Sequence, residues 1–285
     1  MSCHATTWLD MTSARYLRDG SVAPCQVHSS TMQEIQSTEA TAKPGSWALL
    51  HVGSPEAFVH ELCAEARNHS AVRHVYLQRL ASGRLPDIQG AIRDFCHQYH
   101  FYSRGFPNYL KAVISRLHSA SHRDVVRKNL EEEEGWDPKN PANVPHTELF
   151  GRFRRAAGVD EDFENRNAVC ATAKIWSELF LQKCQAPQSG VGLGAIGVAT
   201  EMIVSQVYRY LYEAIVRHTK MTADDYLFLT LHMECDDQHA EALKAISIEL
   251  AEDPCEREAL RFGALAALEL RQLFWDGMLA RAMSR

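Results

Sequence analysis

The chain has 285 residues, of which 46% are hydrophobic and 23% are charged. That balance supports a substantial buried core and excludes fibrous, membrane-embedded and intrinsically disordered proteins. The formal net charge of −6 provides no basic surface for a polyanion, so we expect no nucleic acid partner.

The eight cysteines are scattered along the chain and form no C-x-x-C pair. This pattern favours free, buried thiols in a reducing compartment. The N-terminus lacks a charged segment followed by an apolar one, and we find no apolar run of membrane-spanning length. We therefore expect a cytoplasmic protein with no membrane association.

Residues 1–50 are rich in Ser, Thr, Ala and Gln and show little apolar periodicity, which predicts a loosely ordered N-terminal extension. The helical period begins at Ser54, where a capping serine is followed by a proline and an early glutamate. We expect residues 51–285 to form one domain.

Helical segments separated by Gly and Pro follow one another to the end of the chain. No segment shows the alternation of a strand, so the sequence predicts an all-α fold. The expected helices cover residues 54–80, 87–104, 106–117, 121–134, 146–158, 160–184, 195–218, 222–250 and 254–283.

The glycine-rich stretch GVGLGAIG (190–197) does not follow the order of a phosphate-binding loop, and no strand precedes it. We interpret it as a tight turn between helices.

The stretch HMECDDQHAE (232–241) contains His232, Asp236 and His239 at positions i, i+4 and i+7. On a helix these side chains share one stripe. Leu229 and Met233 indicate an apolar neighbourhood, where an unpaired carboxylate or imidazolium is costly and a metal ion would offset that cost. The alternative is a set of ordinary polar residues in which Asp236 pairs with the histidines.

Two further signals lie elsewhere in the chain. Glu201 stands among small and apolar residues, and a buried carboxylate needs a proton, a cation or a metal ion. The stretch NLEEEE (129–134) ends one predicted helix and His146 begins the next, although four consecutive glutamates usually form a solvated face. Carboxylates and imidazoles on separate helices favour a pair of iron or manganese ions over structural zinc.

Between about Phe58 and Met278 the chain resembles the haem-oxygenase-like diiron oxidases, a group related to TenA, PqqC and CADD. The resemblance rests on RDFCHQYHFYSRGFPNYL, on NLEEEEG with HTELFGRFRRAAGV, on GAIGVATE and on HMECDDQHAEAL. It implies a compact bundle of about seven or eight helices.

The resemblance also implies the metal ligands. The family's Asn-Leu-x-[Asp/Glu]-Glu pattern falls on Glu133, with Glu132 as the alternative if the register shifts. The inserted WDPKNPANVP (136–145) departs from the shorter spacing usual before the next histidine. The implied ligands are Glu133, His146, Glu201, His232, Asp236 and His239.

By the same resemblance, the implied activity is that of an oxidase or monooxygenase with two iron ions and O2 as co-substrate. We favour a small amino-acid-like substrate in a biosynthetic pathway and predict Tyr99 and Tyr208 as pocket residues, with core packing as the alternative role of both. An external electron donor and a homodimer are compatible with this hypothesis. The alternatives are a fatty-acid decarboxylase of the same fold, a metal-free TenA-like protein and an iron-storage bundle.

Overall fold

The computed structural model describes residues 53–136 and 144–284, and the expected N-terminal extension lies outside this part of the chain. The described residues form helices and no strand, which confirms the all-α prediction. The helices are α1 (Pro55–Asn68), α2 (Val75–Ala81), α3 (Ile88–Ser103), α4 (Phe106–Arg116), α5 (Ala120–Glu133), α6 (His146–Ala156), α7 (Glu161–Arg166), α8 (Ala171–Cys184), α9 (Ser189–Leu193), the π-helical segment η2 (Gly194–Glu201), α10 (Met202–His218), α11 (Leu227–Leu250) and α12 (Pro254–Met283).

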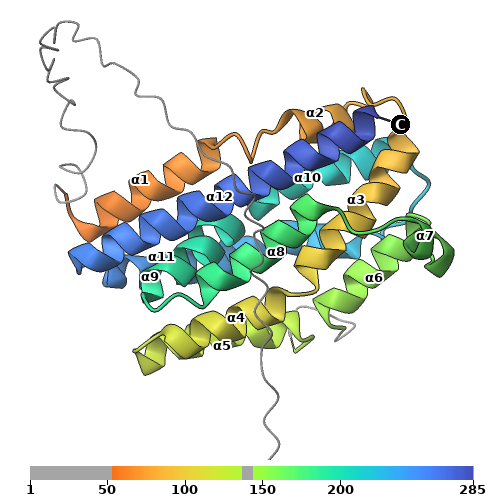
Figure 1. Ribbon diagram of the computed structural model, residues 1–285. Coiled ribbons are helices and arrows are strands. Elements are labelled where there is room, and N and C mark those ends of the chain that lie inside the picture. Colours follow the sequence, from red (N-terminus) through yellow and green to blue (C-terminus); the bar gives the residue numbers. More distant parts are fainter. Residues whose placement is uncertain (1–52, 137–143, 285) are drawn as a thin grey trace, which may run out of the picture. The chain divides into compact units, whose positions relative to one another are not determined.

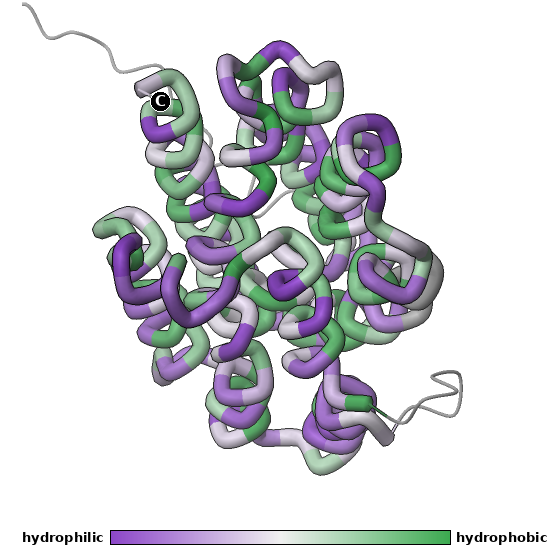
Figure 2. Tube along the Cα trace, turned by 90° about the vertical axis from the view of Figure 1, so that its right-hand side faces the viewer, coloured by the Kyte–Doolittle hydropathy of each residue, from purple (hydrophilic) through white to green (hydrophobic). Residues whose placement is uncertain are grey.

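The helices pack into a bundle in which α12 runs beside α1, α2, α8 and α9 (Figure 1). Helices α10 and α11 pack on each other, and α4 packs on α5. Along the helices in Figure 2, hydrophobic and hydrophilic stretches alternate, as expected for helices that bury one face. Most of the largest buried side chains are aromatic, and they include Phe95, Tyr102, Phe150, Trp176 and Trp275.

The described chain has more helical segments than the seven or eight expected, partly because two predicted helices are interrupted. The segment predicted for 54–80 breaks at His69, whose backbone is extended, and restarts after His74, whose side chain accepts a hydrogen bond from the Tyr76 amide. The segment predicted for 160–184 breaks at Asn167, which is also extended.

The predicted glycine turn is wrong, because residues 189–218 form one continuous helix made of α9, η2 and α10. The glycines serve close packing instead. A Cβ atom on Gly194 would overlap the main-chain oxygen of Leu260 on α12, and one on Gly263 would overlap that of Val191 on α9.

This continuous helix is also long and apolar enough to cross a membrane, contrary to the expectation that no such run exists. However, 83% of its most apolar window is buried inside the described structure, as in the core helix of a soluble protein.

Candidate metal centre

Three side chains from three helices meet in one place, two of them buried and the third, His232, half-buried. Glu133 is the last residue of α5, His146 is the first residue of α6, and His232 lies on α11. One ligand atom from each lies within 4.8 Å of the other two. Nδ1 of His146 is 3.1 Å from Oε1 of Glu133, and Nε2 of His232 is 3.7 Å from the same oxygen. The structure therefore brings together three of the six predicted ligands.

Local sequence places the first two at helix ends. Gly135 has φ of +95°, a conformation that favours glycine and ends α5 directly after the glutamate run. Pro145 precedes His146 as the cap of α6. Glu133 is 7% exposed and His146 is 6% exposed, whereas Glu131 and Glu134 are exposed. Burial thus favours Glu133 within the run of four glutamates.

His232 is oriented as a metal-binding histidine would be. Its Nδ1 lies 2.7 Å from the carbonyl oxygen of Phe228, one turn earlier on α11. A carbonyl only accepts, so Nδ1 donates to it, and Nε2 is the ring nitrogen that faces Glu133 and is available to a metal ion.

Glu133 is ionised despite its burial. Burial alone would raise its pKa, but the charges and hydrogen bonds of His146 and His232 outweigh that effect and hold the pKa well below its usual range. The centre therefore presents a carboxylate rather than a carboxylic acid.

Glu201 ends the π-helical segment and is 5% exposed. It lines the same cavity as Glu133, His146 and His232. Its Oε1 accepts a hydrogen bond of 3.0 Å from Nδ2 of the buried Asn129. We did not predict Asn129, although its position four residues before Glu133 places both on one face of α5.

His239 lies elsewhere on α11, two turns or about 10 Å along the axis from His232. Its Nε2 is 2.6 Å from Oε2 of Glu132. Burial would lower the pKa of His239, but its hydrogen bond to Glu132 and the charges of Glu201, Glu132 and Glu133 raise it to about 9. Glu132, which the sequence offered as the alternative to Glu133, thus contacts the predicted ligand His239. The side chain of Asp236 is not among those that the structure describes, so its predicted role stays a prediction.

A cavity with an empty volume of about 460 Å³, part of it open to solvent, lies beside the centre. Tyr99 and Tyr208 both line it, and their hydroxyl oxygens are 2.9 Å apart. The Tyr208 ring also lies 5.6 Å from that of His232. Further aromatic side chains in the wall are Tyr102, Phe106, Phe150 and Phe228.

The donor set fits iron. Carboxylates and imidazoles suit iron and manganese, whereas structural zinc sites favour thiolates, and no cysteine lines the cavity. The described cysteines are free, namely Cys63, Cys96, Cys170, Cys184 and Cys255.

Comparison with known proteins agrees with this assignment. Residues 93–272, more than half of the chain, match the family described as "Iron-containing redox enzyme". The chain belongs to this family and is an oxidoreductase with a haem-oxygenase-like fold.

The chain is similar to curated proteins named 4-aminobenzoate synthase. The protein from Chlamydia pneumoniae is 26% identical over 184 residues, which cover 65% of this chain and 78% of the relative. The protein from Chlamydia muridarum is 24% identical over 201 residues, covering 70% and 81%.

Solved structures share the fold. A CADD-like protein of unknown function from Nostoc punctiforme superimposes with a TM-score of 0.64 and 16% identity, covering 81% of this chain and 96% of that one. A TenA homologue from Pseudomonas syringae gives 0.61 and 14%, covering 78% and 91%.

Proposed function

We propose that this redox enzyme is a non-haem diiron oxidase or oxygenase that uses O2 to oxidise a small amino-acid-like molecule. The observation that carries the proposal is the set of buried Glu133, buried His146 and half-buried His232, whose ligand atoms lie within 4.8 Å of one another. Without a cation this set leaves a carboxylate and two imidazoles inside an apolar bundle, which is costly.

The remaining predicted ligands supply a second position. Glu201 shares the cavity with the first three residues, and its charge also acts on His239. Both observations support Glu201 as a further ligand of the proposed centre. Asp236, between His232 and His239 on α11, completes the proposed ligand set. Bound iron ions supply redox chemistry with O2 as the co-substrate.

The protein's own groups shape the substrate site. Phe106, Phe150 and Phe228 line the cavity and offer flat apolar surfaces. The paired hydroxyls of Tyr99 and Tyr208 offer hydrogen bonds to a polar substrate group. Such walls suit a small molecule that is partly aromatic or apolar.

The names of the relatives support this substrate class. The chlamydial proteins are called 4-aminobenzoate synthase, and 4-aminobenzoate carries an amine and a carboxylate on a small aromatic ring. We therefore favour a substrate with both groups over a long-chain fatty acid.

Anaerobic titration of the metal-free protein with Fe(II), followed by O2, tests the proposal. We expect about two iron ions per chain and O2 uptake that continues over many turnovers when the correct amino-acid-like substrate is present. Accumulation of ferric mineral would instead indicate iron storage. Failure to bind iron would indicate a metal-free protein of the TenA type, and either result would contradict the proposal.

A further inference from the structure

Arg271 is a charged side chain in the interior of the bundle. It lies on α12, is 1% exposed and sits between buried Leu268 and Phe274 on the same face of the helix. The sequence analysis missed it. The signal was available, because position 271 continues the apolar stripe of Ala267 and Leu268 at helical spacing.

The guanidinium group is incompletely paired. Its Nη2 donates a hydrogen bond of 3.4 Å to Oγ1 of Thr200, while Nε and Nη1 have no hydrogen-bond partner among the described residues. No described Asp or Glu forms an ion pair with it. Arg281, three turns away on the same helix, differs in this respect because it pairs with the carboxylate of Asp94 at 2.7 Å.

Aromatic rings offset only part of this charge. The guanidinium carbon lies 5.1 Å from the ring centroid of Trp176 and 5.8 Å from that of Tyr102. Such contacts contribute about 2 kcal/mol when desolvated, whereas burying an ion costs several kcal/mol. Arginine does not escape this cost by losing its proton. An anion is the partner that the position lacks.

The cavity of the metal centre is the nearest place for that anion. Thr200, which accepts from Arg271, lines the cavity together with Tyr99, Tyr102 and Tyr208. Burial would lower the pKa of Arg271, but nearby Tyr102, Tyr99 and Tyr208 raise it. The hydroxyl of Tyr102 is buried and has no hydrogen-bond partner in the described structure. Hydroxyl groups thus lie between Arg271 and the space where a substrate would bind.

We propose that Arg271, held by its hydrogen bond to Thr200, forms with the hydroxyls of Tyr99 and Tyr102 the receptor for a carboxylate group of the substrate. The hydroxyls of Tyr99 and Tyr102 donate hydrogen bonds to the carboxylate, and the guanidinium supplies the opposite charge from behind them. Arg271 is a positioning and specificity residue, which selects acids over neutral molecules of the same shape. The inference rests on the proposed function, because it takes the cavity beside the metal centre as the substrate site.

Binding of matched acids and amides tests the receptor. The probes are benzoate and the aromatic L-amino acids, each compared with its carboxamide, and binding is measured by ligand-observed NMR on metal-free and on iron-loaded protein. We expect at least one acid to bind at least tenfold more tightly than its amide to both forms. Arg271→Met should remove that preference, and Arg271→Lys should retain part of it because it keeps the charge but not the planar fork.

The matched control is Arg261→Met on the same helix, where the guanidinium pairs with Glu65 and is partly exposed. This variant should keep the preference for acids. If Arg271→Met does not fold, Arg271→Lys and the acid-to-amide ratio of the wild-type protein decide the question.

Equal binding of acid and amide to the wild-type protein across the whole set would overturn the inference. So would an unchanged preference in a folded Arg271→Met variant, because the acid would then bind to iron or elsewhere. Iron content is measured on the same samples. A protein that binds acids through Arg271 but takes up no iron contradicts the proposed function alone, and one that takes up iron without preferring acids contradicts the receptor alone.

Discussion

Oε1 of Glu133 lies 3.1 Å from Nδ1 of His146, although one residue ends α5 and the other begins α6. This arrangement opposes both helix dipoles. A carboxylate is disfavoured at the negative C-terminal end of a helix, and an imidazolium is disfavoured at the positive N-terminal end. A metal cation beside Glu133 offsets the first effect and removes the need for a protonated His146.

Glu133→Gln should therefore lower iron affinity by roughly 100-fold or more, since losing even an outer-shell partner costs 10–100-fold. Iron content after desalting, measured by atomic emission, checks this outcome. Glu131→Gln on the exposed face of the same helix is the control and should bind iron normally. Equal iron content in the two variants would show that Glu133 is not an iron ligand.

The hydrogen bond from Asn129 to Glu201 can be tested by substitution. Its Nδ2 donates to Oε1 of Glu201 and holds that carboxylate in one orientation. We expect Asn129→Ala to lower iron affinity by about 10–100-fold while leaving helical content unchanged by circular dichroism. Asn108→Ala, an exposed position on α4, should have no effect. Normal iron affinity in Asn129→Ala would mean that this hydrogen bond is dispensable.

The sequence indicated which residues would meet, but not how they would pair. Glu133 was selected within the glutamate run by resemblance to a known family, whereas His232 and His146 also stood out as possible ligands in the sequence, and the structure brings these three together. The pairing of Glu132 with His239 could not be read from sequence, since neighbouring glutamates differ by about 100° around the helix and only the position of α11 decides which one faces it.

The continuous helix through the glycine-rich stretch could not be predicted from the sequence either. Gly190, Gly192 and Gly194 suggest a turn when they are considered alone. Their actual role depends on α12, whose backbone comes so close that side chains at Gly194 and Gly263 would overlap main-chain atoms. A packing contact between segments about 70 residues apart has no signature in the local pattern.

That close approach predicts a strong contrast between two glycine substitutions. Gly263→Ala should lower the free energy of unfolding by about 1–3 kcal/mol or more, because its Cβ would overlap the oxygen of Val191. Gly151→Ala on α6 is the control. Its Cβ would meet only Nη1 of Arg155 at 3.6 Å, so removing a helical glycine should raise stability by about 0.4–1 kcal/mol. Urea unfolding measures both, and a neutral Gly263→Ala would contradict the packing described.

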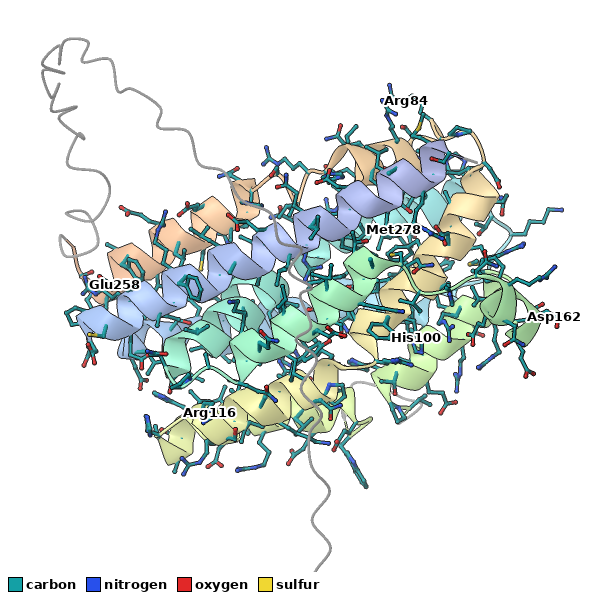
Figure 3. The ribbon with its side chains drawn as sticks, in the orientation of Figure 1. Arg84, His100, Arg116, Asp162, Glu258 and Met278 are labelled. Atoms are coloured by element: carbon teal, nitrogen blue, oxygen red, sulfur yellow. The ribbon has the colours of Figure 1, made fainter. Side chains whose placement is uncertain are left out.

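His100 carries the pH dependence that we expect outside the metal centre. The side chain, labelled in Figure 3, lies on α3, and its ring stacks on Phe150 of α6 at 5.7 Å with the planes 4° apart. Burial lowers its pKa from 6.5 to about 3, assisted by the positive charges of Arg154 and Arg104 and by His97. Glu164 is an acidic residue that lines the same surface pocket as His100, and its carboxylate pairs with Arg154.

The folded protein therefore holds His100 neutral, whereas the unfolded chain protonates it below pH 6.5. Its contribution to stability is fully present above pH 6.5 and is lost as the pH falls toward 3. We expect the urea midpoint of the metal-free protein to fall more between pH 7.5 and pH 5 in the wild type than in His100→Phe, which keeps the aromatic stack on Phe150. His118→Phe, at an exposed position, should follow the wild type. Equal losses in the wild type and His100→Phe would show that His100 does not contribute to acid unfolding.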